Sequence, residues 1–361
     1  MAELNVKLDK IQKGMIVSRD VYTDDDLFLI PADTVINENH ILKLELYQVV
    51  SIYIFEEVID PSAPKTKKKA NVEANLPITK TAKFIEFEHT YEEQTEQIGD
   101  TYFQIITTGL VNAEAITKIA DDVMLDVKNS GDLFSFMCRL QTKDDVTYTH
   151  VLNVSILATI FGKWLHLSDQ DIKNLTIAGM LHDIGKTKIS DDILKKTSPL
   201  TPTEYEEMKL HTVYGYKLIA ATNLDYGIKQ AVLMHHEKMN GFGYPLGISW
   251  DQVHKYTKII GIVDIYDAMT SDRPHRKRMH PFHAIKTLEE ECYGILDTEY
   301  LMVFLQHIAN NYLGNSVRLI DGRIGKIVFI HPQTPSRPLV EVDGQVIDLV
   351  QHDNLTIESF I

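Results

Sequence analysis

The sequence predicts a multidomain α+β protein, in which a central all-α helical bundle is flanked by small β-rich modules at both ends. The chain has 361 residues, enough for two or three domains. Apolar residues alternate with polar ones near both termini, which is typical of strands. Between these regions the apolar residues recur in steps of three and four, which is typical of packed helices.

Residues 1–58 are predicted to form a β-rich regulatory module, because short β-branched runs at 6–8, 15–17, 27–30 and 49–54 are separated by turn residues. Residues 59–85 are predicted to be a linker. They begin with two prolines and a lysine cluster at 65–69 and continue with small polar residues. A solvated linker fits this cluster better than a phosphate-binding patch, because no aromatic residue lies within it.

Residues 86–130 carry a long helical pattern without a proline. The pattern leaves two roles open. The segment is either a connecting helix, which could form a homodimer, or a helix packed on the bundle of its own chain.

Residues 131–313 are predicted to be the helical domain, and residues 314–361 a small β-rich module that is barrel-like or SH3-like. Helix starts are indicated by capping boxes at Ser168–Asp171 and Thr201–Glu204. In the last module, strands are predicted at 316–320, 325–330, 338–342 and 345–350, with turns at the Asp-Gly pairs between them.

The composition limits the classes of partner. A formal net charge of −15 disfavours binding to a nucleic acid polymer. A phosphate ligand would need local cations to bind. Two cysteines cannot form a disulfide framework. The sequence shows no signal peptide pattern and no apolar run long enough for a membrane span. A cytoplasmic location is therefore expected.

Imidazoles and carboxylates recur along the helical region at intervals that place one or two on each successive helix. The candidates are His150, His182, Asp183, His211, His235, His236 and Asp264. Such side chains suit first-row divalent metals, and the lack of nearby cysteines argues against a structural zinc site. The set is larger than one tetrahedral ion requires, so two ions bridged by a carboxylate fit better. Any one of these histidines alone would favour an ordinary core residue.

Several cationic and turn residues adjoin this set. Lys186 lies one turn after Asp183 and is read as a phosphate contact rather than as a lysine that complements a helix dipole. Arg273 and Arg276 suit phosphate contacts and a solvated loop about equally. Residues 241–245 form a tight turn after the paired histidines, by their glycine and proline content.

The ordered motifs resemble the HD-GYP domain, a branch of the HD metal-dependent phosphohydrolases that opens cyclic di-GMP. The matching segments are His182-Asp183-Ile-Gly-Lys186, His235-His236-Glu237 with Gly241-Phe-Gly-Tyr244-Pro245, and Asp264-Ile-Tyr-Asp267-Ala-Met-Thr-Ser-Asp-Arg273-Pro. The resemblance covers residues 131–312 and implies an HD-type bundle.

Roles for individual residues follow from the resemblance. It implies that the candidate set above ligates two metal ions, Fe or Mn, with Asp183 as the bridge. Lys186, Arg273 and Arg276 would contact substrate phosphates. Tyr244 would shape the substrate site or a partner surface, and Asp267 would orient a ligand or a water.

The sequence departs from the family pattern at two positions. Val146 stands where some members have a glutamate that holds a third metal, so a two-metal site is expected unless Asp144 or Asp145 substitutes for it. Asn240 stands where the family usually has aspartate before the Gly-Tyr-Pro turn, which removes a charge.

The expected function is metal-dependent hydrolysis of cyclic di-GMP to pGpG, GMP or both, with Asp183 and Lys186 as the catalytic residues. Other readings are cleavage of a different cyclic dinucleotide such as cyclic GMP-AMP, a receptor that binds cyclic di-GMP without cutting it, or a module that contacts diguanylate cyclase (GGDEF) domains.

Overall fold

The structure, a computed structural model, describes residues 3–22, 28–30, 32, 34–36, 40–41, 44, 49–55, 81–125, 130–137, 140, 146–248, 252–272 and 277–361. The chain divides into two units: Ala82–Leu305 form one, and Met1–Thr81 with Gln306–Ile361 form the other. Across the described ranges, no helix has both the length and the apolar character that a membrane crossing needs.

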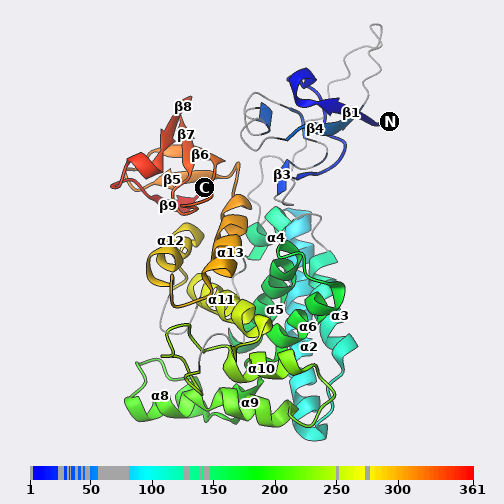
Figure 1. The fold of residues 1–361 in the computed structure, drawn as a ribbon, viewed down its shortest axis with the longest axis vertical. Coiled ribbons are helices and arrows are strands. Elements are labelled where there is room, and N and C mark those ends of the chain that lie inside the picture. Colours follow the sequence, from blue (N-terminus) through cyan, green and yellow to red (C-terminus); the bar gives the residue numbers. More distant parts are fainter. Residues whose placement is uncertain are drawn as a thin grey trace. The chain divides into compact units, whose positions relative to one another are not determined.

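The first unit is a bundle of helices (Figure 1). In chain order its elements are α2 (Ala82–Thr108), α3 (Ala113–Leu125), α4 (Ser130–Met137), α5 (Val146–Trp164), α6 (Asp169–Leu181), the 3-10 turn η4 (Ile184–Lys188), α7 (Asp191–Leu194), α8 (Pro202–Lys209), α9 (His211–Ile219), α10 (Tyr226–Met234), α11 (Lys255–Thr270) and α12 (Pro281–Glu291). Helix α13 (Thr298–Asn310) begins in this unit and continues past its boundary.

Helices α5 and α11 form the interior of this bundle. Every side chain of α5 from Thr149 to Gly162 is buried, and α11 buries residues on all of its sides. A helix that is apolar all round is stable only when other elements surround it, and α5 packs against α2, α6 and α11. Polar side chains on α5 and α11 therefore lie in the core.

The predicted helical segment 86–130 is interrupted. Helix α2 ends at Thr108, and Gly109 follows in the left-handed region with φ of 70° before α3 starts at Ala113. Glycine takes this conformation without steric cost and commonly ends helices. Both helices belong to the bundle, with α2 packed on α3 and α5. The structure thus shows the packed role, while dimer formation stays a prediction.

Two helix starts agree with the capping patterns in the sequence. The Ser168 hydroxyl accepts a hydrogen bond from Asp171 N at the start of α6. Thr201 and Glu204 form a reciprocal capping box at the start of α8, with Pro202 in its first turn. Both predicted capping boxes are therefore confirmed as N-termini.

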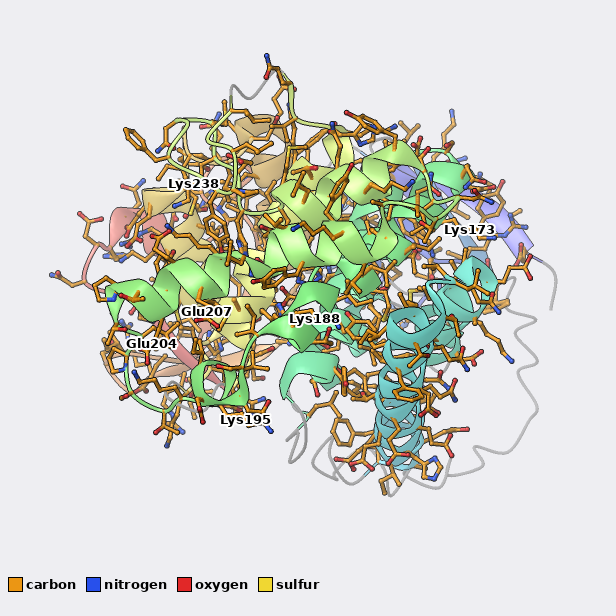
Figure 2. All side chains as sticks on the ribbon, turned by 90° about the horizontal axis from the view of Figure 1, so that it is seen from below. Lys173, Lys188, Lys195, Glu204, Glu207 and Lys238 are labelled. Atoms are coloured by element: carbon orange, nitrogen blue, oxygen red, sulfur yellow. The ribbon has the colours of Figure 1, made fainter. Side chains whose placement is uncertain are left out.

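The surface around α7 and α8 carries charges of both signs. Figure 2 labels four of these charged residues, which are Lys188, Lys195, Glu204 and Glu207. Lys195 pairs with Asp191 at 2.8 Å, and both side chains are 73% exposed. A phosphate ligand approaching this side therefore meets a mixed surface rather than a continuous basic one.

The N-terminal part of the second unit contains two strand pairs. Strand β1 (Glu3–Lys7) pairs antiparallel with β4 (Ser51–Phe55), and β2 (Val21–Tyr22) pairs with β3 (Phe28–Ile30). The run at 15–17 forms only isolated bridges. The lysine cluster 65–69 and most of the predicted linker lie outside the described residues, and the last linker residues already belong to α2.

The C-terminal part forms a five-stranded antiparallel sheet in the order β8-β7-β6-β5-β9. The strands are β5 (Ser316–Leu319), β6 (Ile324–Phe329), β7 (Leu339–Val342), β8 (Gln345–Asp348) and β9 (Ile357–Phe360). The predicted strands are present, and β9, which pairs with β5, is an additional one. Because β8 and β9 are edges, this sheet is open over 316–360 rather than closed into a barrel.

Candidate metal centre

All of the predicted ligand residues meet in the interior of the helical unit. His150 lies in the first turns of α5, His182 and Asp183 follow α6, and His211 opens α9. His235 and His236 follow α10, and Asp264 lies within α11. The side chains are at most 10% exposed, except that of His236, which is 26% exposed.

The Asp183 carboxylate lies between two pairs of imidazoles. Its Oδ1 is 3.3 Å from His211 Nε2 and 4.0 Å from His235 Nε2. Its Oδ2 is 3.4 Å from His182 Nε2 and 3.6 Å from His150 Nε2. Each oxygen of this carboxylate therefore faces a different pair of ring nitrogens.

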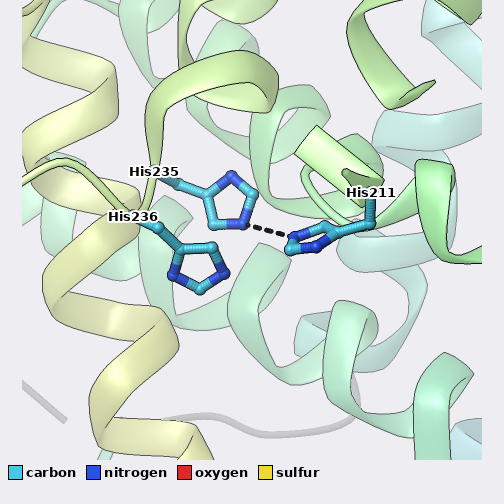
Figure 3. A group of neighbouring side chains, drawn as sticks. All are labelled: His211, His235 and His236. Carbon is cyan, nitrogen blue, oxygen red and sulfur yellow. Dashed lines mark hydrogen bonds between the residues drawn. The ribbon is translucent and has the colours of Figure 1, made fainter. Parts of the chain in front are cut away.

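Asp264 faces the same centre from α11. Its Oδ1 is 3.0 Å from His150 Nε2 and 3.9 Å from His182 Nε2, while its Oδ2 is 3.7 Å from His236 Nδ1. Ligand atoms lie within 4.8 Å of one another in three groups: His211 with His235 and His236, His150 with His182 and Asp264, and His182 with Asp183 and His235. Figure 3 shows the first group.

The outward nitrogens of the rings are held by acceptors, which fixes the direction of the inward ones. Nδ1 of His182 lies 2.7 Å from Gly179 O, and Nδ1 of His211 lies 2.7 Å from Met208 O. Nδ1 of His235 lies 3.1 Å from Ala231 O. A carbonyl only accepts, so each Nδ1 carries a proton and each Nε2 points into the centre.

The inward atoms fit a cation. His211 Nε2 and His235 Nε2 are 3.4 Å apart, as the dashed line in Figure 3 marks, and with both protons on Nδ1 neither can donate to the other. His182 Nε2 and Asp183 Oδ1 are also buried without a hydrogen-bond partner. Leaving such atoms unpaired is costly, and a divalent metal ion would satisfy them.

Burial and charge set the protonation of these groups. Burial lowers the pKa of His235 well below its usual value and that of His236 to about 3. For Asp183, burial opposes ionisation, but Lys186 and His182 outweigh it and hold the pKa well below the usual range. Burial also disfavours a charged His150, yet contacts with Asp264 and Asp267 raise its pKa to about 9. The centre thus combines ionised carboxylates with neutral His235 and His236, while the metal-free His150 ring is charged and would give up its Nε2 proton on binding a metal.

The other predicted residues are placed as follows. Lys186 donates a hydrogen bond to Asp183 Oδ2 and is 20% exposed, so it borders the centre. The Tyr244 ring lies 4.6 Å from the His236 ring, and burial raises the pKa of its hydroxyl. Asp267 Oδ2 lies 2.7 Å from His150 Nδ1. Arg273 and Arg276 lie outside the described residues.

Val146 and Asn240, the two positions that depart from the family pattern, lie in regions that the structure describes only in part. Asp144, Asp145 and the side chain of Val146 lie outside the described residues, so the number of metals at that end stays a prediction. Asn240 is exposed, and its Oδ1 accepts a hydrogen bond of 3.1 Å from Phe242 N. An aspartate would offer the same acceptor.

Glu237 is a structural residue of the site to which the sequence reasoning assigned no role. Its side chain is 2% exposed, and Oε1 accepts hydrogen bonds from Leu246 N at 2.6 Å and Gly247 N at 3.0 Å. These bonds hold the turn that carries Tyr244 against the paired histidines. In the sequence, the signal for this role is an acidic residue that follows a pair of histidines and precedes a glycine-rich turn.

Comparison with known proteins identifies the domain that holds this centre. Residues 135–298 match the family model of the HD domain, and this segment includes every candidate ligand residue described above.

Curated relatives of the chain are named as cyclic-dinucleotide phosphodiesterases. Cyclic di-GMP phosphodiesterase PA4108 of Pseudomonas aeruginosa is 31% identical over 227 residues, which cover 63% of this chain and 55% of that protein. A cyclic di-GMP phosphodiesterase of Thermotoga maritima is 32% identical over 45% of each chain. The 3'3'-cGAMP-specific phosphodiesterase 3 of Vibrio cholerae is 31% identical over 44% of this chain and 35% of that one. The chain spans about half the length of these relatives or less.

Among solved structures, Bd1817, an HDG"Y"P protein from Bdellovibrio bacteriovorus, aligns with a TM-score of 0.51 at 14% identity. The alignment covers 84% of this chain and 98% of that one. At this identity the likeness shows a shared fold.

Proposed function

We propose that this protein is an HD-GYP-type phosphodiesterase that hydrolyses cyclic di-GMP to pGpG, GMP or both. The observation that carries the proposal is the position of Asp183, whose oxygens each face a separate pair of imidazoles. The names of the relatives agree with this substrate class.

The centre suits two divalent ions that share Asp183. His150, His182 and Asp264 would hold one ion, and His211, His235 and His236 the other. Nitrogen and carboxylate ligands without thiolates fit Fe or Mn. When bound, such ions lower the pKa of a water and offset the charge that develops on a phosphodiester.

The residues around the centre would bind and orient the substrate. Lys186 lies beside Asp183 with its side chain 20% exposed, so we expect it to donate to a phosphate oxygen at the centre. Tyr244 covers one side of His236, and Lys209 Nζ lies 5.7 Å from the Tyr244 ring and 4.9 Å from the Tyr205 ring. These groups supply an aromatic and cationic wall next to the ligands, which suits a nucleotide.

A second substrate deserves a parallel test, because a relative is named as specific for 3'3'-cGAMP. The metal ligands and Lys186 recognise the phosphodiester, which both cyclic dinucleotides share. The competing roles of receptor and interaction module follow from the same fold. For the latter, Phe242 in the turn is 84% exposed and could contact GGDEF partners. We propose a cytoplasmic location for the enzyme.

The deciding experiment is product analysis after anaerobic reconstitution with iron or manganese, with cyclic di-GMP and 3'3'-cGAMP as substrates. Wild-type protein should give metal-dependent pGpG or GMP, and Asp183→Ala should abolish the product. The matched control is Asp191→Ala, which removes an exposed carboxylate and should leave turnover unchanged.

The other outcomes separate the alternatives. Tight binding without cleavage would indicate a receptor, and neither binding nor cleavage would indicate an interaction module. Full turnover in Asp183→Ala would refute the assigned site.

A further inference from the structure

A buried chain of hydrogen bonds runs from helix α2 to the candidate ligand His150. The Tyr91 hydroxyl on α2 lies 2.6 Å from Asn153 Oδ1, and Asn153 Nδ2 lies 2.8 Å from Asp267 Oδ1. The other carboxylate oxygen, Asp267 Oδ2, lies 2.7 Å from His150 Nδ1. Tyr91, Asn153, Asp267 and His150 are each at most 8% exposed.

The chemistry of the groups fixes the direction of every bond in this chain. An ionised Asp267 only accepts, so the Asn153 amide must turn its NH₂ group toward it and its oxygen toward Tyr91. The Tyr91 hydroxyl must then donate. For the same reason, His150 Nδ1 donates to Asp267 Oδ2, which turns Nε2 of the same ring toward the metal centre.

Asp267 has little freedom within this arrangement. Its Oδ1 also accepts a bond of 3.0 Å from the Ser271 hydroxyl, so both carboxylate oxygens are engaged. Without Tyr91, the Asn153 oxygen would lose its side-chain donor and the amide could rotate. The Tyr91 ring itself packs 5.8 Å from Phe87, which holds the hydroxyl in place.

Tyr91 lies outside residues 135–298, the segment that matches the HD domain, although it belongs to the same compact unit. We propose that Tyr91 and Asn153 are positioning residues, which act through Asp267 to set the orientation of the His150 ring for metal binding. Helix α2 is therefore part of the metal centre rather than only a cover for the bundle. This inference rests on the metal site of the proposed function.

The test is Tyr91→Phe, which removes the hydroxyl and keeps the ring. Mn²⁺ affinity is measured by calorimetry, and the environment of the His150 ring nitrogens by ¹⁵N NMR of the metal-free protein. We expect affinity at one site to fall about 10-fold, the low end for residues that orient a metal ligand. The His150 signals should shift at the same time.

The matched control is Tyr256→Phe. Tyr256 is also buried, and its hydroxyl donates a bond of 2.6 Å to a carboxylate, that of Asp171, which lies outside the chain of bonds described above. It should lose comparable thermal stability and keep its metal affinity. A double-mutant cycle is completed by Asn153→Ala and by the variant that combines it with Tyr91→Phe. The combined variant should bind Mn²⁺ no more weakly than Asn153→Ala alone.

The outcomes distinguish this inference from the function on which it rests. Wild-type metal affinity and unchanged His150 signals in Tyr91→Phe would overturn the inference, even if the wild-type protein cleaves cyclic di-GMP. Equal losses of metal affinity in Tyr91→Phe and Tyr256→Phe would reduce Tyr91 to a stability residue and overturn it as well. A wild-type protein that binds no metal would overturn both proposals.

Discussion

Replacing Gly185 with alanine should disrupt the metal centre while leaving most of the bundle intact. A Cβ at this position would lie 1.8 Å from His211 O and 2.4 Å from Gly215 N, both of which are backbone atoms of α9. Real contacts of this kind stay above 3.0 Å, so η4 and α9 must separate by about 1.2 Å. Gly185 lies two residues after Asp183, and its added Cβ would meet the backbone of His211. The displacement therefore moves Asp183 and His211 apart.

The magnitudes follow from this displacement. A shift of about 1 Å in a reacting geometry costs on the order of 100-fold in rate. Overpacking of a rigid contact costs about 1–3 kcal/mol in the free energy of unfolding. We therefore expect Gly185→Ala to remain folded, with metal-dependent turnover of cyclic di-GMP reduced about 100-fold and weaker binding of Mn²⁺.

The assays are initial-rate product analysis, calorimetric metal titration and urea unfolding. The control is Gly162→Ala on α5, whose Cβ would meet only side-chain atoms closely, at 3.1 and 3.2 Å. Those side chains can adjust, so this variant should keep its activity. Wild-type turnover and metal affinity in Gly185→Ala would refute the reasoning, since the two backbones would then have room to separate without moving Asp183.

Further predictions concern three other residues. Glu237→Ala leaves Leu246 N and Gly247 N without their buried acceptor, so it should lower the free energy of unfolding by about 3 kcal/mol; a urea-unfolding loss below about 0.5 kcal/mol would contradict this. Hydrogen bonds from Tyr256 and Lys255 lower the pKa of Asp171 from 3.8 to about 2, so the charged form stabilises the protein above pH 3.8 and this contribution is lost as the pH falls toward 2. Asp171→Asn should therefore cost about 1 kcal/mol at pH 7 after allowance for solvent screening, with a difference from wild type that shrinks between pH 4 and 2 in thermal unfolding; a constant difference would argue against a charge effect. Asn240→Asp should leave turnover within about twofold, because the bond to Phe242 N needs only an acceptor; a large gain in activity would show that the missing charge matters.

The sequence allowed the candidate ligands to be selected and their convergence to be expected, because each is a polar residue in or beside an apolar helix. His150 and Asp264 interrupt helices that are otherwise buried on all sides, and His211 and His235 lie at helix boundaries. Local spacing is enough to place such residues on successive helices of one bundle. The fold class was also predictable, since the periodicity of apolar residues changes between the bundle and the terminal modules.

Other features depend on contacts between distant parts of the chain, which local patterns do not encode. The apolar spacing continues through Leu110, so only the backbone angle at Gly109 shows where α2 ends. Strand β9 is defined by its pairing with β5. Tyr91 and Asn153 read as ordinary core residues until their hydrogen bonds to one another and to Asp267 are known.

The uneven exposure of the ligands implies an order in which ions enter and leave. The His236 side chain is 26% exposed, whereas those of His150 and His182 are 6% and 0% exposed. Of the two positions in the proposed two-metal site, the one that includes His236 is therefore the more exposed among the described residues. We expect a chelator to remove the ions in two kinetic phases, the fast one from the set that includes His236. Partly loaded protein would then hold its metal at the position that includes His150. Product assays on such a sample would measure the turnover of a half-filled centre.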